Sequence, residues 1–229
     1  SEQSTGSCIQ VKQQEEQKVR RVMPKNAINR DGLFPGVKKN SGEMVNNDYP
    51  ATISAEEIEK KDLSWFRGEI VLIDNMQTFR EVFPTLLDSP LLGFDTETRP
   101  SFRKGRKNRV SLIQLANSEV ACLFRINRIG IPDELAALLA NPDVIKAGVA
   151  VHDDIRFLKK VNGFAPSGFV DLQKFVKGYG IENSGLKKLA AIVLGIRISK
   201  RQQVTDWEAD QLTEAQQVYA ATDAWVCHQ

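Results

Sequence analysis

The chain has 229 residues and a formal net charge of +2, with 31 Lys or Arg residues and 29 Asp or Glu residues. It has no apolar run of about 18 residues, and its start lacks a basic stretch followed by an apolar one, so we expect neither a membrane span nor a secretory signal. Three widely spaced cysteines, Cys8, Cys122 and Cys227, and only two histidines argue against a disulfide framework and a zinc site, and favour a reduced, cytoplasmic setting.

Residues 1–48 are rich in polar residues and glycine and show no sustained hydrophobic period. This composition predicts a flexible N-terminal tail or arm, with a short helix over residues 11–22. A folded domain over residues 49–229 is expected to follow. Ser54, with Glu57 three residues later, is typical of a capping box at the start of its first helix.

The remaining elements are predicted from hydrophobic periodicity. Strands are expected over residues 70–73, 91–98, 110–116, 120–124 and 144–149. Helices are expected over residues 77–87, 132–140, 153–161, 172–179, 186–194 and from 213 to the C-terminus. Early strands with short links, followed by alternating strands and helices, predict an α/β fold with a central mixed sheet flanked by helices. The last helical pattern still continues at Gln229, so we expect the natural helix to extend further.

Two carboxylates, Asp95 and Glu97, lie in the apolar strand LLGFDTETR. Side chains alternate faces along a strand, so these two point the same way, about 7 Å apart. An isolated pair of this kind also fits a strand end that pairs with Lys or Arg. In a dry environment the two charges repel each other, and Mg²⁺ or Mn²⁺ is the simplest compensation because these ions prefer oxygen ligands.

A second acidic pair, Asp153 and Asp154, occupies a predicted helix start, where negative charge is favourable. Asp154 shares a helix face with Leu158 and Val161, which we expect to face the sheet. Asp153 shares a face with the charged Lys160. We therefore assign the inward, functional role to Asp154, and a capping or surface role to Asp153.

Near the C-terminus, Tyr219 and Asp223 are four residues apart on a predicted helix and project from the same face. This spacing alone has little specificity. Together with the strand pair and Asp154, however, Asp223 completes a set of four carboxylates that could hold two divalent ions beside a phosphodiester. Tyr219 could then position the attacking water by hydrogen bonding.

Two basic segments accompany these acids. Residues 99–109 contain six cations and no acid, and residues 184–205 also lack acids. Such segments are commonly solvated loops, but next to an acidic site they suit a polyanionic substrate. The candidate contacts to a nucleic-acid backbone are Arg103, Lys104, Arg106, Lys107 and Lys200.

The segments FDTET, GVAVHDDIRFL and YAATD, in this order, resemble the three motifs of the DEDDy 3′–5′ exonucleases. RVSLIQLA, SGLKKLAAIVLGIRISK and TDW extend the similarity over roughly residues 70–226. Werner-type exonuclease domains are the most similar group, and the ribonuclease D group follows. The resemblance implies a ribonuclease-H-like fold and removal of nucleotides from 3′ ends with two Mg²⁺ or Mn²⁺ ions. By motif, Asp95, Glu97, Asp154 and Asp223 would be metal ligands, and Tyr219 would orient the water.

Several alternatives stay open at the level of sequence. One is ribonuclease D-like processing of RNA 3′ ends, another is a non-catalytic nucleic-acid-binding module of the same fold, and a third is a metal-dependent endonuclease. The expected partner is single-stranded or 3′-ended DNA or RNA rather than a membrane, and no protein partner is indicated. Contacts to the ribose 2′-hydroxyl cannot be recognised in sequence, so only the Werner-type resemblance favours DNA, and only slightly.

Overall fold

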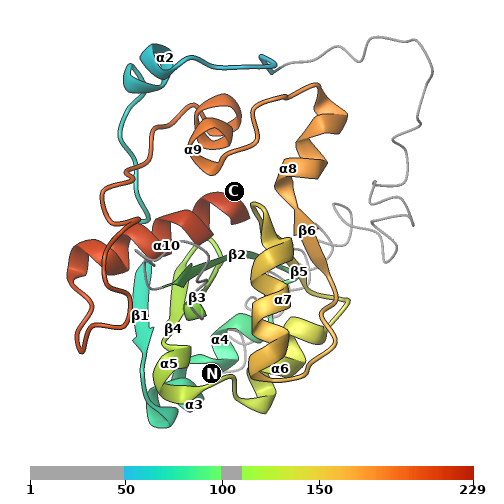
Figure 1. The fold of residues 1–229 in the computed structure, drawn as a ribbon, viewed down its shortest axis with the longest axis vertical. Helices are drawn as coiled ribbons and strands as arrows, with labels where there is room; N and C mark the ends of the chain where they lie inside the picture. The colour runs from blue at the N-terminus through green and yellow to red at the C-terminus, as the bar shows by residue number, and fades with distance from the viewer. Residues whose placement is uncertain (1–48, 99–109) are drawn as a thin grey trace, which may run out of the picture. The chain divides into compact units, whose positions relative to one another are not determined.

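The computed structural model describes residues 49–98 and 110–229 (Figure 1). The expected N-terminal arm and the helix over residues 11–22 lie outside this part. The strands are β1 (Glu69–Ile73), β2 (Leu91–Thr98), β3 (Val110–Ala116), β4 (Val120–Phe124), β5 (Ile145–Gly148) and β6 (Phe169–Asp171). The helices are α2 (Ala55–Glu59), α3 (Met76–Val82), α4 (Pro84–Leu87), α5 (Ile126–Ile129), α6 (Asp133–Ala140), α7 (Val151–Val161), α8 (Leu172–Phe175), η1 (Val176–Tyr179), α9 (Leu186–Leu189), η2 (Ala190–Leu194) and α10 (Glu214–His228). Among these helices, none has both the length and the apolar character needed to cross a membrane.

The strands of the described residues form one six-stranded mixed sheet in the order β1-β4-β3-β2-β5-β6. β3 runs antiparallel to both β2 and β4, whereas β1 pairs with β4, and β5 with β2 and β6, in parallel. This arrangement confirms the predicted central mixed sheet flanked by helices. Because β2 lies inside the sheet, the carboxylates that it carries lie against the protein interior rather than at an open edge.

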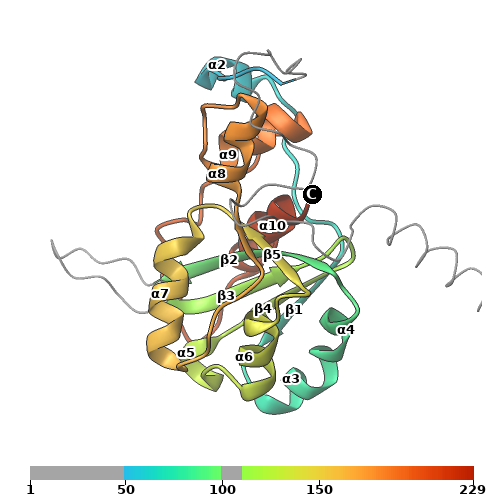
Figure 2. The ribbon, with the colours of Figure 1, turned by 90° about the vertical axis from the view of Figure 1, so that its right-hand side faces the viewer.

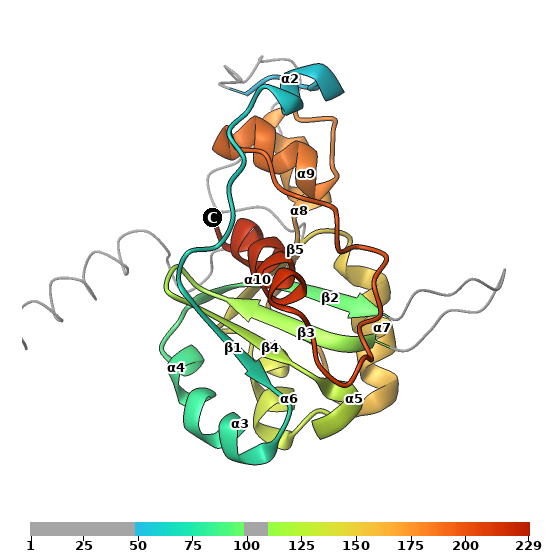
Figure 3. The same ribbon diagram turned by 90° about the vertical axis from the view of Figure 1, so that its left-hand side faces the viewer.

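Helices cover both faces of the sheet. α10 crosses one face (Figure 3), where Ala220, Ala221 and Ala224 are fully buried and let the helix pack closely on the strands. The opposite face packs against α3, α4, α6 and α7, and its core includes Phe79, Leu135 and Leu158. This two-sided burial explains why the central strands have few polar residues.

A smaller hydrophobic cluster joins α2, η1, α9 and η2. The ribbon shows α2 and α9 next to each other (Figure 2). Ile58 and Leu189 are among its buried members. Outside the cluster, Glu59 of α2 forms ion pairs with Lys187 at 3.0 Å and Arg197 at 3.3 Å. These two ion pairs attach α9 and the loop after η2 to α2. This segment leads towards the acidic site. The capping box expected at Ser54 is present.

Three predicted helices differ from those observed. The helix expected over residues 77–87 is divided into α3 and α4, because Pro84 has no N–H for an internal helical bond and instead begins α4. The helix expected over 172–179 tightens from α8 into the 3₁₀ turn η1. The helix expected over 186–194 widens from α9 into the π-helical turn η2, which ends at Gly195 with a φ of 69°.

Helix α7 also departs from expectation. It begins at Val151 rather than at residue 153, and its N-cap is Ala150 in the left-handed conformation with a φ of 57°. Leu158 is buried as expected, but the prediction for Val161 was wrong, because this last helical residue is 45% exposed. β6 and α5 were not predicted, since elements of 3 and 4 residues are too short to show a hydrophobic period.

Candidate active site

Three of the predicted carboxylates come together where β2 packs against α10. Oxygen atoms of Asp95, Glu97 and Asp223 all lie within 4.8 Å of one another. Asp95 and Glu97 share a face of β2, and Gly93 lies on the same face two residues earlier. A Cβ atom at Gly93 would lie 1.8 Å from the backbone oxygen of Ala224. Glycine is therefore needed for the close approach that brings Asp223 to the strand pair.

Asp154, the fourth predicted carboxylate, lies beside this group rather than within it. It is half-buried in the first turn of α7, and the Thr96 hydroxyl hydrogen-bonds to its carboxylate. Asp153 is exposed and forms an ion pair with Arg156 at 3.1 Å. The structure thus gives the inward orientation to Asp154 and the surface position to Asp153. Asp153 is not the helix cap, because that position belongs to Ala150.

Burial raises the pKa of every carboxyl group in this cluster. Desolvation raises the pKa of Glu97 to about 10, and the neighbouring Asp95 adds to the shift. For Asp95, burial and then the Asp223 charge raise the pKa well above its usual range. Burial raises the pKa of Asp223 to about 7, against the opposing effects of the Tyr219 hydrogen bond and the Lys200 charge. Without a compensating cation, the fully ionised cluster is therefore unfavourable.

Tyr219 lies one helical turn before Asp223, and its hydroxyl donates a hydrogen bond to the Asp223 carboxylate. Its ring is buried, with the centroid 6.0 Å from that of Trp207. Burial and the nearby carboxylates raise the pKa of Tyr219 above its usual range. The phenol therefore stays protonated and serves as a hydrogen-bond donor.

A cavity of about 320 Å³ opens over the carboxylates. Lys187 and Lys200 line it together with the acidic group, so cations border a negative site. Cys227 also lines the cavity, and burial raises the pKa of its thiol, which keeps this wall uncharged. The other predicted basic contacts, Arg103, Lys104, Arg106 and Lys107, lie outside the described residues.

Two polar residues near the carboxylates were not singled out from the sequence. Thr96 holds Asp154, although it lies between Asp95 and Glu97 in the first motif. Gln114 lies directly opposite Asp95 on β3, and its fully buried amide has no hydrogen-bond partner among the described residues. Only the pairing of β2 with β3 could have identified Gln114, because local sequence does not reveal cross-strand neighbours.

The donor set fits a divalent metal. In the described part of the chain, no Lys or Arg forms a salt bridge with Asp95, Glu97 or Asp223. Carboxylate oxygens are the ligands preferred by Mg²⁺ and Mn²⁺. A bound cation would supply the charge that the raised pKa values show to be missing. The group therefore has the composition of a metal site rather than of an ion-pair network.

Comparison with known proteins agrees with this geometry. A family model described as 3′–5′ exonuclease matches residues 70–229. The mouse bifunctional 3′–5′ exonuclease/ATP-dependent helicase WRN is 35% identical over 153 residues, which is 61% of this chain and 10% of that protein. Ribonuclease D of Gluconacetobacter diazotrophicus is 31% identical over 158 residues, which is 67% of this chain and 39% of that protein. This chain therefore spans well under half the length of either relative.

Solved structures show the same fold. Escherichia coli RNase D is 26% identical, with a TM-score of 0.61 over 69% of this chain and 42% of that one. The EXO domain of Aedes aegypti Nibbler is 27% identical, with a TM-score of 0.58 over 67% of this chain and 81% of that one. These likenesses confirm the expected ribonuclease-H-like fold. Because the family model covers more than half of the chain, this protein belongs to the DEDDy-type 3′–5′ exonuclease family.

Proposed function

We propose that this chain removes nucleotides from the 3′ end of a nucleic-acid strand by phosphodiester hydrolysis, with two divalent ions, Mg²⁺ or Mn²⁺. The observation that supports this most directly is the cluster of Asp95, Glu97 and Asp223, which forms no salt bridge with a Lys or Arg of the described residues. Asp154 is close enough for its charge to raise the pKa values of Asp95 and Glu97. Membership of the exonuclease family supports the same chemistry.

In this proposal, Asp95, Glu97, Asp154 and Asp223 hold the ions. When bound, such ions lower the pKa of an attacking water and stabilise charge on the attacking and leaving oxygens. The chain itself provides orientation. The Tyr219 hydroxyl, which donates a hydrogen bond to Asp223, accepts a hydrogen bond from the water and so aligns it with the phosphorus. Lys200 lies where it can balance charge on the substrate phosphate.

For the substrate, we propose DNA slightly ahead of RNA. The likeness to the mouse WRN relative, which is 35% identical and is named as an exonuclease joined to a helicase, is the reason for placing DNA first. The competing candidate is processing of RNA 3′ ends. It is supported by the likeness to Escherichia coli RNase D, which is described as an exoribonuclease involved in structured RNA processing. In either case, Arg103, Lys104, Arg106 and Lys107 are proposed to contact the strand backbone.

End-labelled strands test the activity and its direction. With Mg²⁺ or Mn²⁺, a 3′-labelled single strand should release labelled mononucleotides at once, whereas a 5′-labelled strand should shorten progressively. A chelator should stop both reactions. Matched DNA and RNA oligonucleotides, digested side by side, give the substrate preference from the ratio of their kcat/KM values.

Two controls separate the alternatives. The Asp95→Ala variant should keep its fold and lose the activity, because it removes a proposed metal ligand from β2. A circular single strand should resist digestion, and its cleavage would indicate an endonuclease instead. Binding without hydrolysis by the wild-type chain, with either metal, would identify a non-catalytic binding module.

A further inference from the structure

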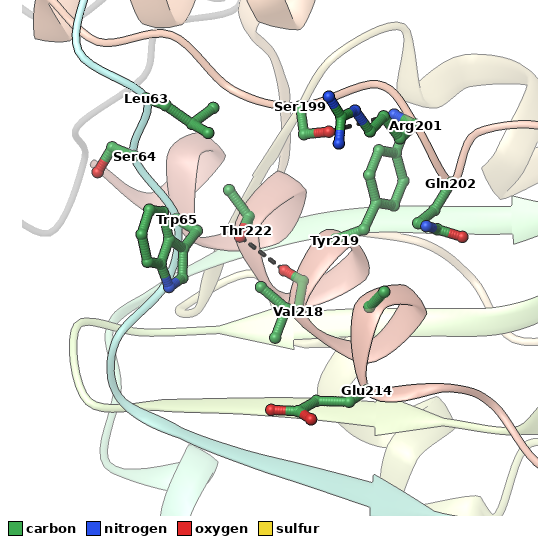
Figure 4. Close-up of a pocket in the computed structure, with 11 residues that line it drawn as sticks. Leu63, Ser64, Trp65, Ser199, Arg201, Gln202, Glu214, Val218, Tyr219 and Thr222 are labelled. Carbon is green, nitrogen blue, oxygen red and sulfur yellow. Dashed lines mark hydrogen bonds between the residues drawn. The ribbon is translucent and has the colours of Figure 1, made fainter.

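A second pocket, of about 430 Å³, adjoins the acidic cavity (Figure 4). The chain before β1, with Leu63 and Trp65, forms one wall, and the loop containing Arg201 forms another. α10 provides the floor through Val218 and Tyr219. Ser199 and Tyr219 also line the cavity over the carboxylates, so the two spaces share a boundary at the residue proposed to orient the water.

Hydrogen bonds hold the Trp65 wall in place. The backbone N–H of Ser64 donates to the carbonyl oxygen of Arg197 at 2.8 Å. The backbone N–H of Phe66 donates to the Thr222 hydroxyl at 3.1 Å, and this hydroxyl in turn donates to the Val218 carbonyl at 2.6 Å. The wall is therefore attached both to the loop after η2 and to α10.

The chemistry of the pocket suits a flat, uncharged ring that is attached to an anion. The Trp65 indole is 36% exposed, and the Arg67 guanidinium lies 3.4 Å from its ring centroid, which restricts the orientation of the indole. Leu63, 46% exposed, and Val218 add aliphatic surface. Arg201 supplies a positive charge for a phosphate, and Glu214 is an acidic member of the same lining. Nucleobases bind single-strand-binding proteins by stacking on aromatic rings within a basic groove.

We propose that this pocket, named here the base pocket, binds a nucleobase from the last two nucleotides at the 3′ end of the strand. This inference rests on the proposed exonuclease function and adds a specific contact to it. The shared boundary at Tyr219 gives the reason. In this proposal, a strand with its phosphate at the carboxylates places a neighbouring base across that boundary, against Trp65 and Leu63, whose apolar surface otherwise faces solvent.

A double-mutant cycle between protein and substrate tests the base pocket. Wild type and Trp65→Ala are compared on single strands that carry either a normal base or an abasic residue at the last or the second-last position. Loss of the recognised base should lower wild-type kcat/KM by about 10-fold, and Trp65→Ala should cost about as much on the intact strand. The two losses should not add, because both remove the same contact.

Control variants keep the test informative. Leu87→Ala removes a similarly exposed apolar side chain, 53% exposed, from α4 and should leave kcat/KM unchanged. Trp65→Phe retains an aromatic face and should recover most of the loss, and melting temperatures show whether each variant folds. Losses that multiply, or no effect of Trp65→Ala on any strand, would overturn the base pocket and would favour an apolar side chain of a protein partner as its occupant.

The same cycle can be run without catalysis, by measuring oligonucleotide binding through fluorescence anisotropy in chelator. This separates the two proposals. Non-additive binding in a protein that hydrolyses nothing would support the base pocket and contradict the exonuclease function. Metal-dependent release of nucleotides, together with strictly additive losses in the cycle, would support the exonuclease function and contradict the base pocket.

Discussion

At the scale of single residues, the site combines carboxylates whose joint ionisation is unfavourable unless a cation is bound. Glu97 and Asp223 are buried, Asp95 is half-buried, and all three carry raised pKa values for the same reason, loss of hydration. Around them, Thr96 and Tyr219 donate hydrogen bonds to carboxylates. The role of each side chain can therefore be tested with a variant that removes one interaction and keeps the shape of the side chain.

The adjacent aspartates of α7 provide a matched pair for the first prediction. Asp154→Asn should lower kcat by more than about 100-fold, because it weakens a proposed metal ligand that faces the cluster. Asp153→Asn should retain nearly all activity and lose no more than about 1 kcal/mol of unfolding free energy, since its ion pair with Arg156 is exposed. Single-turnover rates and urea unfolding measure both effects. The reverse pattern of activity would contradict the assignment of Asp154.

A second prediction concerns the Tyr219 hydroxyl. Tyr219→Phe should lower the single-turnover rate by about 100-fold, because the water loses the hydroxyl that orients it while the bound ions remain. Oligonucleotide affinity and melting temperature should change little, since the ring keeps its packing against Trp207. A variant that cuts at the wild-type rate would show that Tyr219 serves only the core.

At the scale of elements, the site is made by the contact between β2 and α10. Gly93 and the three alanines of α10 remove the side chains that would hold the helix away from the strand. The loop before α10 is tied to the end of β4. Arg125 is fully buried and bonds the backbone carbonyl oxygens of Ala209 and Asp210, just before α10 begins.

Gly93→Ala tests this contact. The added methyl group would collide with the backbone of α10, so the variant should lose about 2–3 kcal/mol of unfolding free energy and most of its activity as Asp223 moves away from Asp95. Gly163→Ala is the matched control, because a Cβ atom there meets no other atom within 4 Å. Its stability should change by less than about 1 kcal/mol. Urea unfolding at pH 7 gives both values, and equal stability of the two variants would contradict the close packing.

At the scale of the whole molecule, the carboxylate cluster links stability to pH and to metal. The folded pKa values of Asp223, about 7, and Glu97, about 10, lie above the ordinary values near 4 that apply in the unfolded chain. Between these limits the folded state binds more protons than the unfolded state. The unfolding free energy contributed by these groups therefore falls as pH rises.

We accordingly expect the protein in chelator to lose a few kcal/mol of stability between about pH 5 and pH 8. Mg²⁺ or Mn²⁺ should remove most of this loss, because metal binding requires the ionised carboxylates. Asp95→Ala should flatten the pH dependence, and in chelator at pH 8 it should be at least as stable as wild type. Melting temperatures over this pH range, with and without metal, measure these changes. If the stability in chelator rises with pH, the carboxyl groups do not have raised pKa values in the metal-free protein, and the prediction is wrong.

Much of this architecture was determined by local sequence alone. The alternation of β2 places Asp95 and Glu97 on one face, and the four-residue spacing on α10 places Tyr219 beside Asp223. Both relations follow from the period of a single element, and the structure has them. The strands of the mixed sheet other than β6 were predicted for the same reason, because strands of 4 to 8 residues carry a clear apolar pattern.

Only the tertiary structure decided how the elements meet. The position of Gln114 opposite Asp95, the hydrogen bond from Thr96 to Asp154, and the exposure of Val161 depend on partners distant in sequence. The base pocket is of the same kind, since Trp65 and Tyr219 are 154 positions apart and line one pocket only because the chain before β1 packs on α10. Local periodicity defines which face of an element is buried, but the shape and charge of a cavity depend on distances between faces, which packing alone sets.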